Sequence, residues 1–232
     1  MLEAYTTAHL TFCADLLVAI GGLSSFSEAR TGLHFVWGHW KELLPLDLLW
    51  HVKESILMND EDLIKKREKR VKSGIFPTWS WPSMMIDNER DKLSGSTIWG
   101  RDGDIIFDGL ELLSEVLSVS SDQQARQDSI TWGVLVLRGL IFPALSYPDL
   151  LQIPSVRTTI DIALSDNEEV YRLVVFRDPP NEDLELEGIC GGLLLRVSTI
   201  ADEELYERVG YWEQKETWFE SSDCEEKEVM VR

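Results

Sequence analysis

ITWGVLVLRGLIF, residues 130–142, decides the fold class, because β-branched and other apolar residues dominate it and two glycines interrupt it. This composition favours a buried strand, and the glycines indicate bulges or sharp bends. Further runs of similar character are TIDIAL (159–164), VYRLVVF (170–176), GGLLLRVS (191–198), YERVGYW (206–212) and the closing EVMVR. Polar turn sequences, SDNEE, RDPPNED and STIADEE, lie between several of these runs. Short strands at this spacing predict a mainly antiparallel sheet that curls on itself or forms a sandwich.

The chain before this sheet, residues 1–72, has a helical pattern. A first helix is predicted with Thr11 as its cap, and a Gly pair weakens that helix or ends it early. Its apolar stripe consists of Leu16, Leu17, Ile20 and Leu23. A second helix is predicted from near Leu46 to Val52, with Pro45 near its first turn.

The junction of the two halves carries the segment PTWSWPS, residues 77–83. Trp79 and Trp81 alternate there, which predicts a strand with both indoles on one face. The acidic-then-basic stretch near 59–74 is predicted to be a mobile connection. We therefore expect an α+β fold in one compact domain, with a helical segment 1–72 packed on a β-rich segment 73–232.

The charge of the chain argues against a nucleic acid as partner. The formal net charge is −19 at pH 7, and the basic run KKREKRVK (65–72) holds six basic residues and one acidic residue. A chain this acidic repels phosphate backbones. The run follows the acidic NDED, and we interpret it as a solvated loop or helix end rather than a nuclear-localisation or anionic-lipid patch.

The cysteines and the apolar runs indicate a cytoplasmic compartment. Cys13, Cys190 and Cys224 are odd in number and widely spaced, which argues against a disulfide framework or a zinc site. Free thiols are typical of a reducing compartment. The sequence contains no recognisable secretory signal, and no apolar run reaches the length of a membrane span, so we expect no membrane association.

No residue pattern in the sequence indicates a catalytic centre. His34 and His39 are close together, but no carboxylate or Cys stands at a useful spacing for a shared metal, so aromatic packing or exposure is favoured. Three carboxylates form a second cluster: Asp102, Asp104 and Asp108. A polar turn explains this cluster better than a calcium loop, because Leu113 occupies the position where such a loop needs Glu. We therefore expect no catalytic residue, no metal, no cofactor and no enzymatic activity.

A series of short blocks carries a family resemblance. The blocks are Tyr5 with LTFCADLLVAIGGL (10–23), FVWGHWKELLPLDLLW (35–50), PTWSWPS (77–83), GGLLLR (191–196), ERVG (207–210) and TWF (217–219). In this order they resemble the region that follows the HET domain in fungal heterokaryon-incompatibility (HET) proteins. Two positions depart from the pattern: Pro82 stands where Ala is usual, and His39 where Leu is common. The blocks of the HET domain itself, a module of the Toll/interleukin-receptor type, are missing from the sequence.

The resemblance implies a non-catalytic regulatory and recognition region, acting in allorecognition and the control of programmed cell death. The implied partner is a protein, namely a HET domain located upstream or on a separate chain. An alternative is a Trp-rich β-module that binds a carbohydrate or small molecule. Its candidate aromatic residues are Trp79, Trp81, Trp99 and Trp132. A hydrolase that uses the Asp102–Asp108 cluster is the third reading.

Overall fold

The computed structural model describes residues 16–52, 69, 76–84, 93–94, 110–120, 133–154, 156–162, 164–180, 188–200, 203–215 and 223–232. The helices in these ranges are α2 (Leu16–Thr31) and α4 (Tyr147–Leu151), with 3₁₀ turns η2 (Lys41–Leu43), η3 (Leu46–Leu48) and η4 (Trp81–Met84). The short strands are β1 (Phe35–Val36), β2 (His39–Trp40), β3 (His51–Val52), β4 (Leu93–Ser94) and β5 (Glu111–Leu112). The longer strands are β6 (Ser114–Val119), β7 (Leu135–Ser146), β8 (Val156–Ile160), β9 (Glu169–Asp178), β10 (Ile189–Ile200), β11 (Glu203–Lys215) and β12 (Glu225–Val231).

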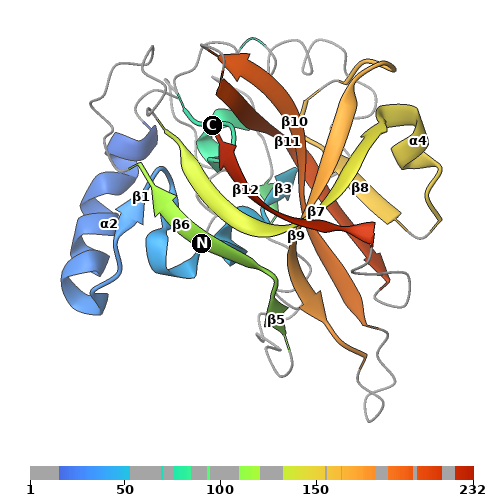
Figure 1. Ribbon diagram of the computed structural model, residues 1–232. Coiled ribbons are helices and arrows are strands. Elements are labelled where there is room, and N and C mark those ends of the chain that lie inside the picture. Colours follow the sequence, from blue (N-terminus) through green and yellow to red (C-terminus); the bar gives the residue numbers. More distant parts are fainter. Residues whose placement is uncertain are drawn as a thin grey trace.

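The main sheet closes on itself (Figure 1). Its strands follow the order β5-β9-β10-β11-β12-β7-β6, with β8 paired to β11. Because β7 also pairs with β9, the strands β7, β9, β10, β11 and β12 form a closed ring. The pairings around this ring are antiparallel except that of β11 with β12, where Tyr206 meets Val231 in parallel. The predicted α+β fold with a mainly antiparallel, curled sheet is thereby confirmed.

The strands β9 and β10 are buried on both faces. Successive side chains of a strand point to opposite faces. One face of β9, which includes Leu173, belongs to a hydrophobic cluster that contains Trp79. The other face, which includes Val174, belongs to a second cluster that contains Trp81. The N-terminal segment completes the core of the sheet, because it shares the first cluster with β7, β9, β10, β11 and β12. Its residues in that cluster are Val36, Trp37, Leu44, Leu48 and Leu49.

The predicted strand at PTWSWPS is wrong. Its backbone turns instead, with Ser80 N–H donating to the Pro77 carbonyl and Ser83 N–H donating to the Ser80 carbonyl, each at 3.0 Å. The turn leads into η4, where Pro82 is tolerated because a 3₁₀ turn needs no N–H from its first residues. The two indoles therefore do not share one face, since Trp79 and Trp81 enter different clusters.

The predicted second helix is also wrong. Residues 46–48 form only the 3₁₀ turn η3, and the chain then extends into β3. The guanidinium of Arg208 accounts for this, because it donates to the carbonyls of Leu48 and Trp50. An α-helix ending at Val52 would use the Leu48 carbonyl for its last i to i+4 bond, whereas the Trp50 carbonyl would be one of its unpaired terminal groups. The tertiary contact therefore replaces the local helical bonds.

The first predicted helix is present as α2, and it continues through the Gly pair. Its buried face differs from the predicted stripe, however. Ile20 is buried and Leu17 is half-buried, but Leu23 is 51% exposed. Ser24, which is buried, continues the face instead, because it lies one helical turn beyond Ile20.

The predicted segment boundary at residues 72 and 73, and most of the charged stretch near 59–74, lie outside the described residues. Within the described ranges, no helix combines the length and the apolar character that crossing a membrane requires.

Candidate ligand pocket around Arg172

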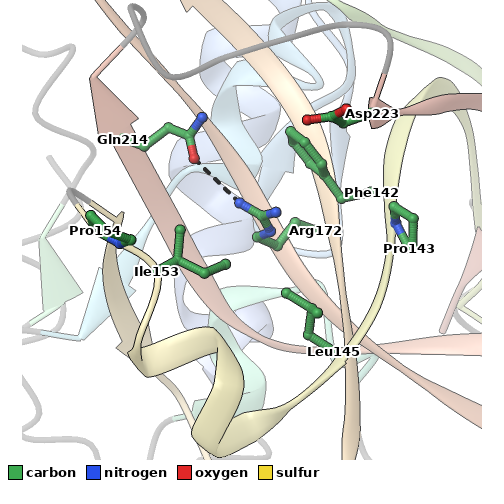
Figure 2. Close-up of a pocket in the computed structure, with 8 residues that line it drawn as sticks. All are labelled: Phe142, Pro143, Leu145, Ile153, Pro154, Arg172, Gln214 and Asp223. Atoms are coloured by element: carbon green, nitrogen blue, oxygen red, sulfur yellow. Dashed lines mark hydrogen bonds between the residues drawn. The ribbon is translucent and has the colours of Figure 1, made fainter.

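A pocket opens beside the ring of strands, at the point where β7, β9 and β11 are covered by the segment that follows α4 (Figure 2). Its volume is about 490 Å³, which is within the range of small-molecule sites. Of the described residues that line it, five are apolar and three are polar or charged. The lining residues are Phe142, Pro143, Leu145, Ile153, Pro154, Arg172, Gln214 and Asp223.

Arg172 is the central polar residue of this pocket, and only 7% of it is exposed. It lies opposite Phe142 in the pairing of β7 with β9, and its guanidinium carbon stands 3.9 Å from the centre of the Phe142 ring. The ring of Trp212 lies 5.3 Å from the same carbon. Stacking on aromatic faces stabilises a guanidinium and leaves its in-plane N–H groups available as donors.

The donors of Arg172 are only partly used. Nη1 donates to Oε1 of Gln214 at 3.2 Å, as the dashed line in Figure 2 marks. Nε is buried without a hydrogen-bond partner in the part of the chain that the structure describes. Leaving a buried donor unsatisfied costs about 1–3 kcal/mol, and more for a charged group. The site therefore holds a cation with unused hydrogen-bonding capacity.

The neighbours of Arg172 neutralise its charge only weakly. Burial raises the pKa of the Cys224 thiol to about 11, so this thiol is uncharged at neutral pH. Asp223 lines the pocket and favours the charged form of Arg172, but it makes no ion pair with the guanidinium among the described contacts. Burial lowers the pKa of Arg172, yet an arginine stays protonated at neutral pH.

A second buried arginine, Arg208, holds the fold together and does not line the pocket. Its Nε donates to Oδ2 of Asp161 at 3.0 Å, and both side chains are completely buried. Its Nη1 donates to the Leu48 carbonyl at 2.5 Å, and Nη2 donates to the Trp50 carbonyl. The guanidinium also stacks on the ring of Trp50, 3.4 Å from its centre. This cation joins β11 to the N-terminal segment.

The two histidines that were considered as a metal pair lie in different environments. His34 is exposed, and its Nδ1 lies 2.6 Å from Oε1 of Glu42. His39 is buried against the ring of Trp79, with 5.6 Å between the ring centres. The described residues contain no group of three or more side chains that could hold a metal ion. The structure therefore packs His39 against an aromatic ring and leaves His34 exposed, and the sequence favoured these two environments.

Several other predicted candidates are buried or lie outside the described residues. Trp79 and Trp81 are almost completely buried, so they form no surface platform for a carbohydrate. Cys190 is buried in the core and Cys224 is half-buried. The remaining candidates lie outside the described part of the chain: Cys13, Trp99, Trp132, Asp102, Asp104 and Asp108.

Sequence reasoning did not single out Arg172, although one signal points to it. In VYRLVVF a single charged residue interrupts a run that is otherwise apolar or aromatic, and charged residues are seldom buried without a specific partner. Arg208 in ERVGYW carries a similar signal. Nothing in the sequence distinguishes which of the two lines a pocket. Comparisons with protein-family models, with curated proteins and with solved structures found no match to this chain.

Proposed function

We propose that this chain is a non-catalytic recognition and regulatory region of a fungal heterokaryon-incompatibility protein, acting in the control of programmed cell death. It works in the cytoplasm without a cofactor, on a protein partner. That partner is a HET domain, either upstream in the same polypeptide or on a separate chain.

One observation carries this proposal: three of the sequence blocks behind the resemblance, FVWGHWKELLPLDLLW (35–50), PTWSWPS (77–83) and ERVG (207–210), meet in the folded core. Trp81 of PTWSWPS donates its Nε1–H to the Gly38 carbonyl at 2.7 Å, within FVWGHW. Trp50, at the end of LLPLDLLW, donates to the Trp79 carbonyl at 3.1 Å. Arg208 of ERVG reaches the carbonyl of the same Trp50. Residues that are up to 160 positions apart in the sequence are thus parts of one scaffold.

This arrangement explains why such blocks occur together in the absence of an active-site motif. Each polar group in the network bonds to a backbone carbonyl of another block, so each block requires the others to avoid an unsatisfied buried group. The blocks therefore stabilise the fold. Recognition is then a property of the surface residues that this fold exposes.

Inducible expression in a filamentous fungus tests the proposal. Residues 1–232 alone are expected to leave growth unchanged, whereas a HET domain that kills on expression is expected to be restrained when this chain is fused to it. The control is the same fusion carrying Arg208→Met, which disrupts the scaffold. Death caused by residues 1–232 alone would refute the proposal.

The mass of the native protein distinguishes the two arrangements of the partner. An antibody against this chain is expected to detect a band well above 26.6 kDa when a HET domain precedes it in the same polypeptide. A band at 26.6 kDa assigns the partner to a separate chain.

A second candidate function, the binding of a small molecule, is favoured by the Arg172 pocket. Its volume is within the range of ligand sites, and five of its eight described lining residues are apolar. The binding surface is then the pocket and not Trp79 and Trp81, which are buried. Ligand entry is expected to change the fluorescence of Trp212, which lies against both Phe142 and Arg172. A change abolished by filling the pocket with Ile153→Trp supports this function.

A further inference from the structure

The Arg172 pocket combines a buried cation with apolar walls, and this combination restricts the ligands that it suits. We propose that it binds a small organic monocarboxylate, with the carboxylate on the guanidinium of Arg172 and the apolar body of the ligand against the pocket wall. This inference rests on the second candidate function above, the binding of a small molecule, and adds the chemical class.

The donor geometry of Arg172 matches a carboxylate. A guanidinium presents its N–H groups in one plane, and a carboxylate accepts two parallel hydrogen bonds from one edge of it. Gln214 occupies Nη1, and Nε and Nη2 form another edge of the guanidinium. Nε has no other partner in the described part of the chain, so a ligand oxygen there replaces no protein hydrogen bond. Charge-assisted hydrogen bonds of this kind are about twice as strong as neutral ones.

The position of Arg172 holds this edge in place before a ligand arrives. Stacking on Phe142 at 3.9 Å and on Trp212 at 5.3 Å fixes the plane of the guanidinium. The bond to Gln214, itself only 4% exposed, fixes its rotation in that plane. A donor that is ordered in advance spares the ligand the entropy of ordering it.

The surrounding charge favours one negative charge over two. Among the described residues, Arg172 is the one cation in the lining of the pocket, and the carboxylate of Asp223 also lies there. The chain as a whole carries −19, so a phosphate dianion experiences more repulsion than a carboxylate does. Phe142, Leu145 and Ile153 provide the apolar contact that a hydrocarbon or aromatic ligand body requires.

Fluorine NMR with three probes of one shape tests this inference. The probes are 4-fluorophenylacetate, its neutral amide 4-fluorophenylacetamide, and 4-fluorobenzylphosphonate. We expect saturable binding of the carboxylate, with an affinity at least tenfold higher than that of the amide and higher than that of the phosphonate. Arg172→Gln is expected to lower the affinity for the carboxylate at least tenfold, towards that of the amide. Arg157→Gln, at an arginine whose side chain is 84% exposed, is the charge-matched control and is expected to change nothing.

The outcomes separate this inference from the binding function on which it rests. If the amide or the phosphonate binds as tightly as the carboxylate, the pocket binds ligands but the carboxylate class is wrong. If none of the probes binds at millimolar concentration, both the inference and the binding function are refuted. If Arg172→Gln fails to fold, Ile153→Trp replaces it, because it fills the pocket without removing the cation. Unchanged carboxylate binding in Ile153→Trp refutes the assignment to this pocket.

Discussion

Replacement of Asp161 by Asn removes the charge that balances Arg208 while keeping the shape of the side chain. Both residues are completely buried, and Oδ2 of Asp161 accepts from Nε of Arg208 at 3.0 Å. Burial lowers the pKa of Arg208, but its guanidinium stays protonated, so the variant retains a buried cation without its counter-charge.

The expected loss in the free energy of unfolding depends on the groups that still contact the Arg208 guanidinium in the variant. Removing one partner of a buried ion pair costs about 3–5 kcal/mol. The carbonyls of Leu48 and Trp50 and the ring of Trp50 continue to stabilise the guanidinium, so we expect a loss of about 3 kcal/mol, near the lower limit. For a chain of this length that loss lowers Tm by about 6–12 °C. Arg208→Met is expected to cost more, because it leaves the carboxylate and both carbonyls without this donor.

Urea unfolding, followed by circular dichroism and by tryptophan fluorescence, measures these losses. The matched control is Glu228→Gln, which breaks the exposed pair between Glu228 and Arg138 at 2.7 Å and is expected to leave the midpoint unchanged. A loss below about 1 kcal/mol in Asp161→Asn, the value typical of surface pairs, would refute the reasoning. So would a larger loss in Asp161→Asn than in Arg208→Met.

Three further predictions concern glycine, cysteine and tryptophan positions. Gly192→Ala places a Cβ against the backbone of β9 and is expected to lower the free energy of unfolding in urea by about 1–3 kcal/mol. Gly22→Ala, with open space around it, is expected to stabilise α2 by up to about 1 kcal/mol. Equal effects of the two substitutions would contradict this prediction. Burial raises the pKa of Cys224 from 9.0 to about 11, so its stabilising contribution is complete below pH 9 and is lost as the pH rises to 11. Alkylation of Cys224 by iodoacetamide, followed by mass spectrometry of its peptide, is accordingly expected to rise about tenfold per pH unit until that pKa, and a plateau near pH 9 would contradict it. Trp81→Phe removes the donor to the Gly38 carbonyl and is expected to cost roughly 1–3 kcal/mol in the same unfolding assay; a loss within error would contradict the role of that bond.

Most strands from residue 135 to the end of the chain were predictable from the sequence, because their pattern is local. The predicted strand TIDIAL (159–164) is misplaced, because β8 spans Val156–Ile160 and the chain bends at residues 161–162. The predicted runs VYRLVVF and GGLLLRVS lie within β9 and β10. A sequence of apolar and β-branched residues between polar turns favours a strand wherever its partner lies. The closure of the sheet was expected only in general terms, and the pairing of β7 with β9 that produces it was not.

The two errors in secondary structure share a cause. PTWSWPS alternates like a strand, and residues 46–52 resemble a helix, but in both segments distant residues bind the backbone. Trp50 donates to the carbonyl of Trp79, and Arg208 donates to the carbonyls of Leu48 and Trp50. Local periodicity contains no information about a donor 160 residues away.

The candidate pocket likewise has features that the sequence determined and features that only the tertiary structure decided. The sequence alone determined that the chain can fold as an α+β protein, and it placed Arg172 in the middle of an apolar strand. Only the tertiary structure decided that Arg172 lies beside a pocket and makes no ion pair with a carboxylate of the described residues, whereas Arg208 is paired with the buried Asp161. The physical reason is that each strand alternates its side chains between two faces, and the charge partners on those faces come from other segments of the chain. The closure of the ring brings those segments together.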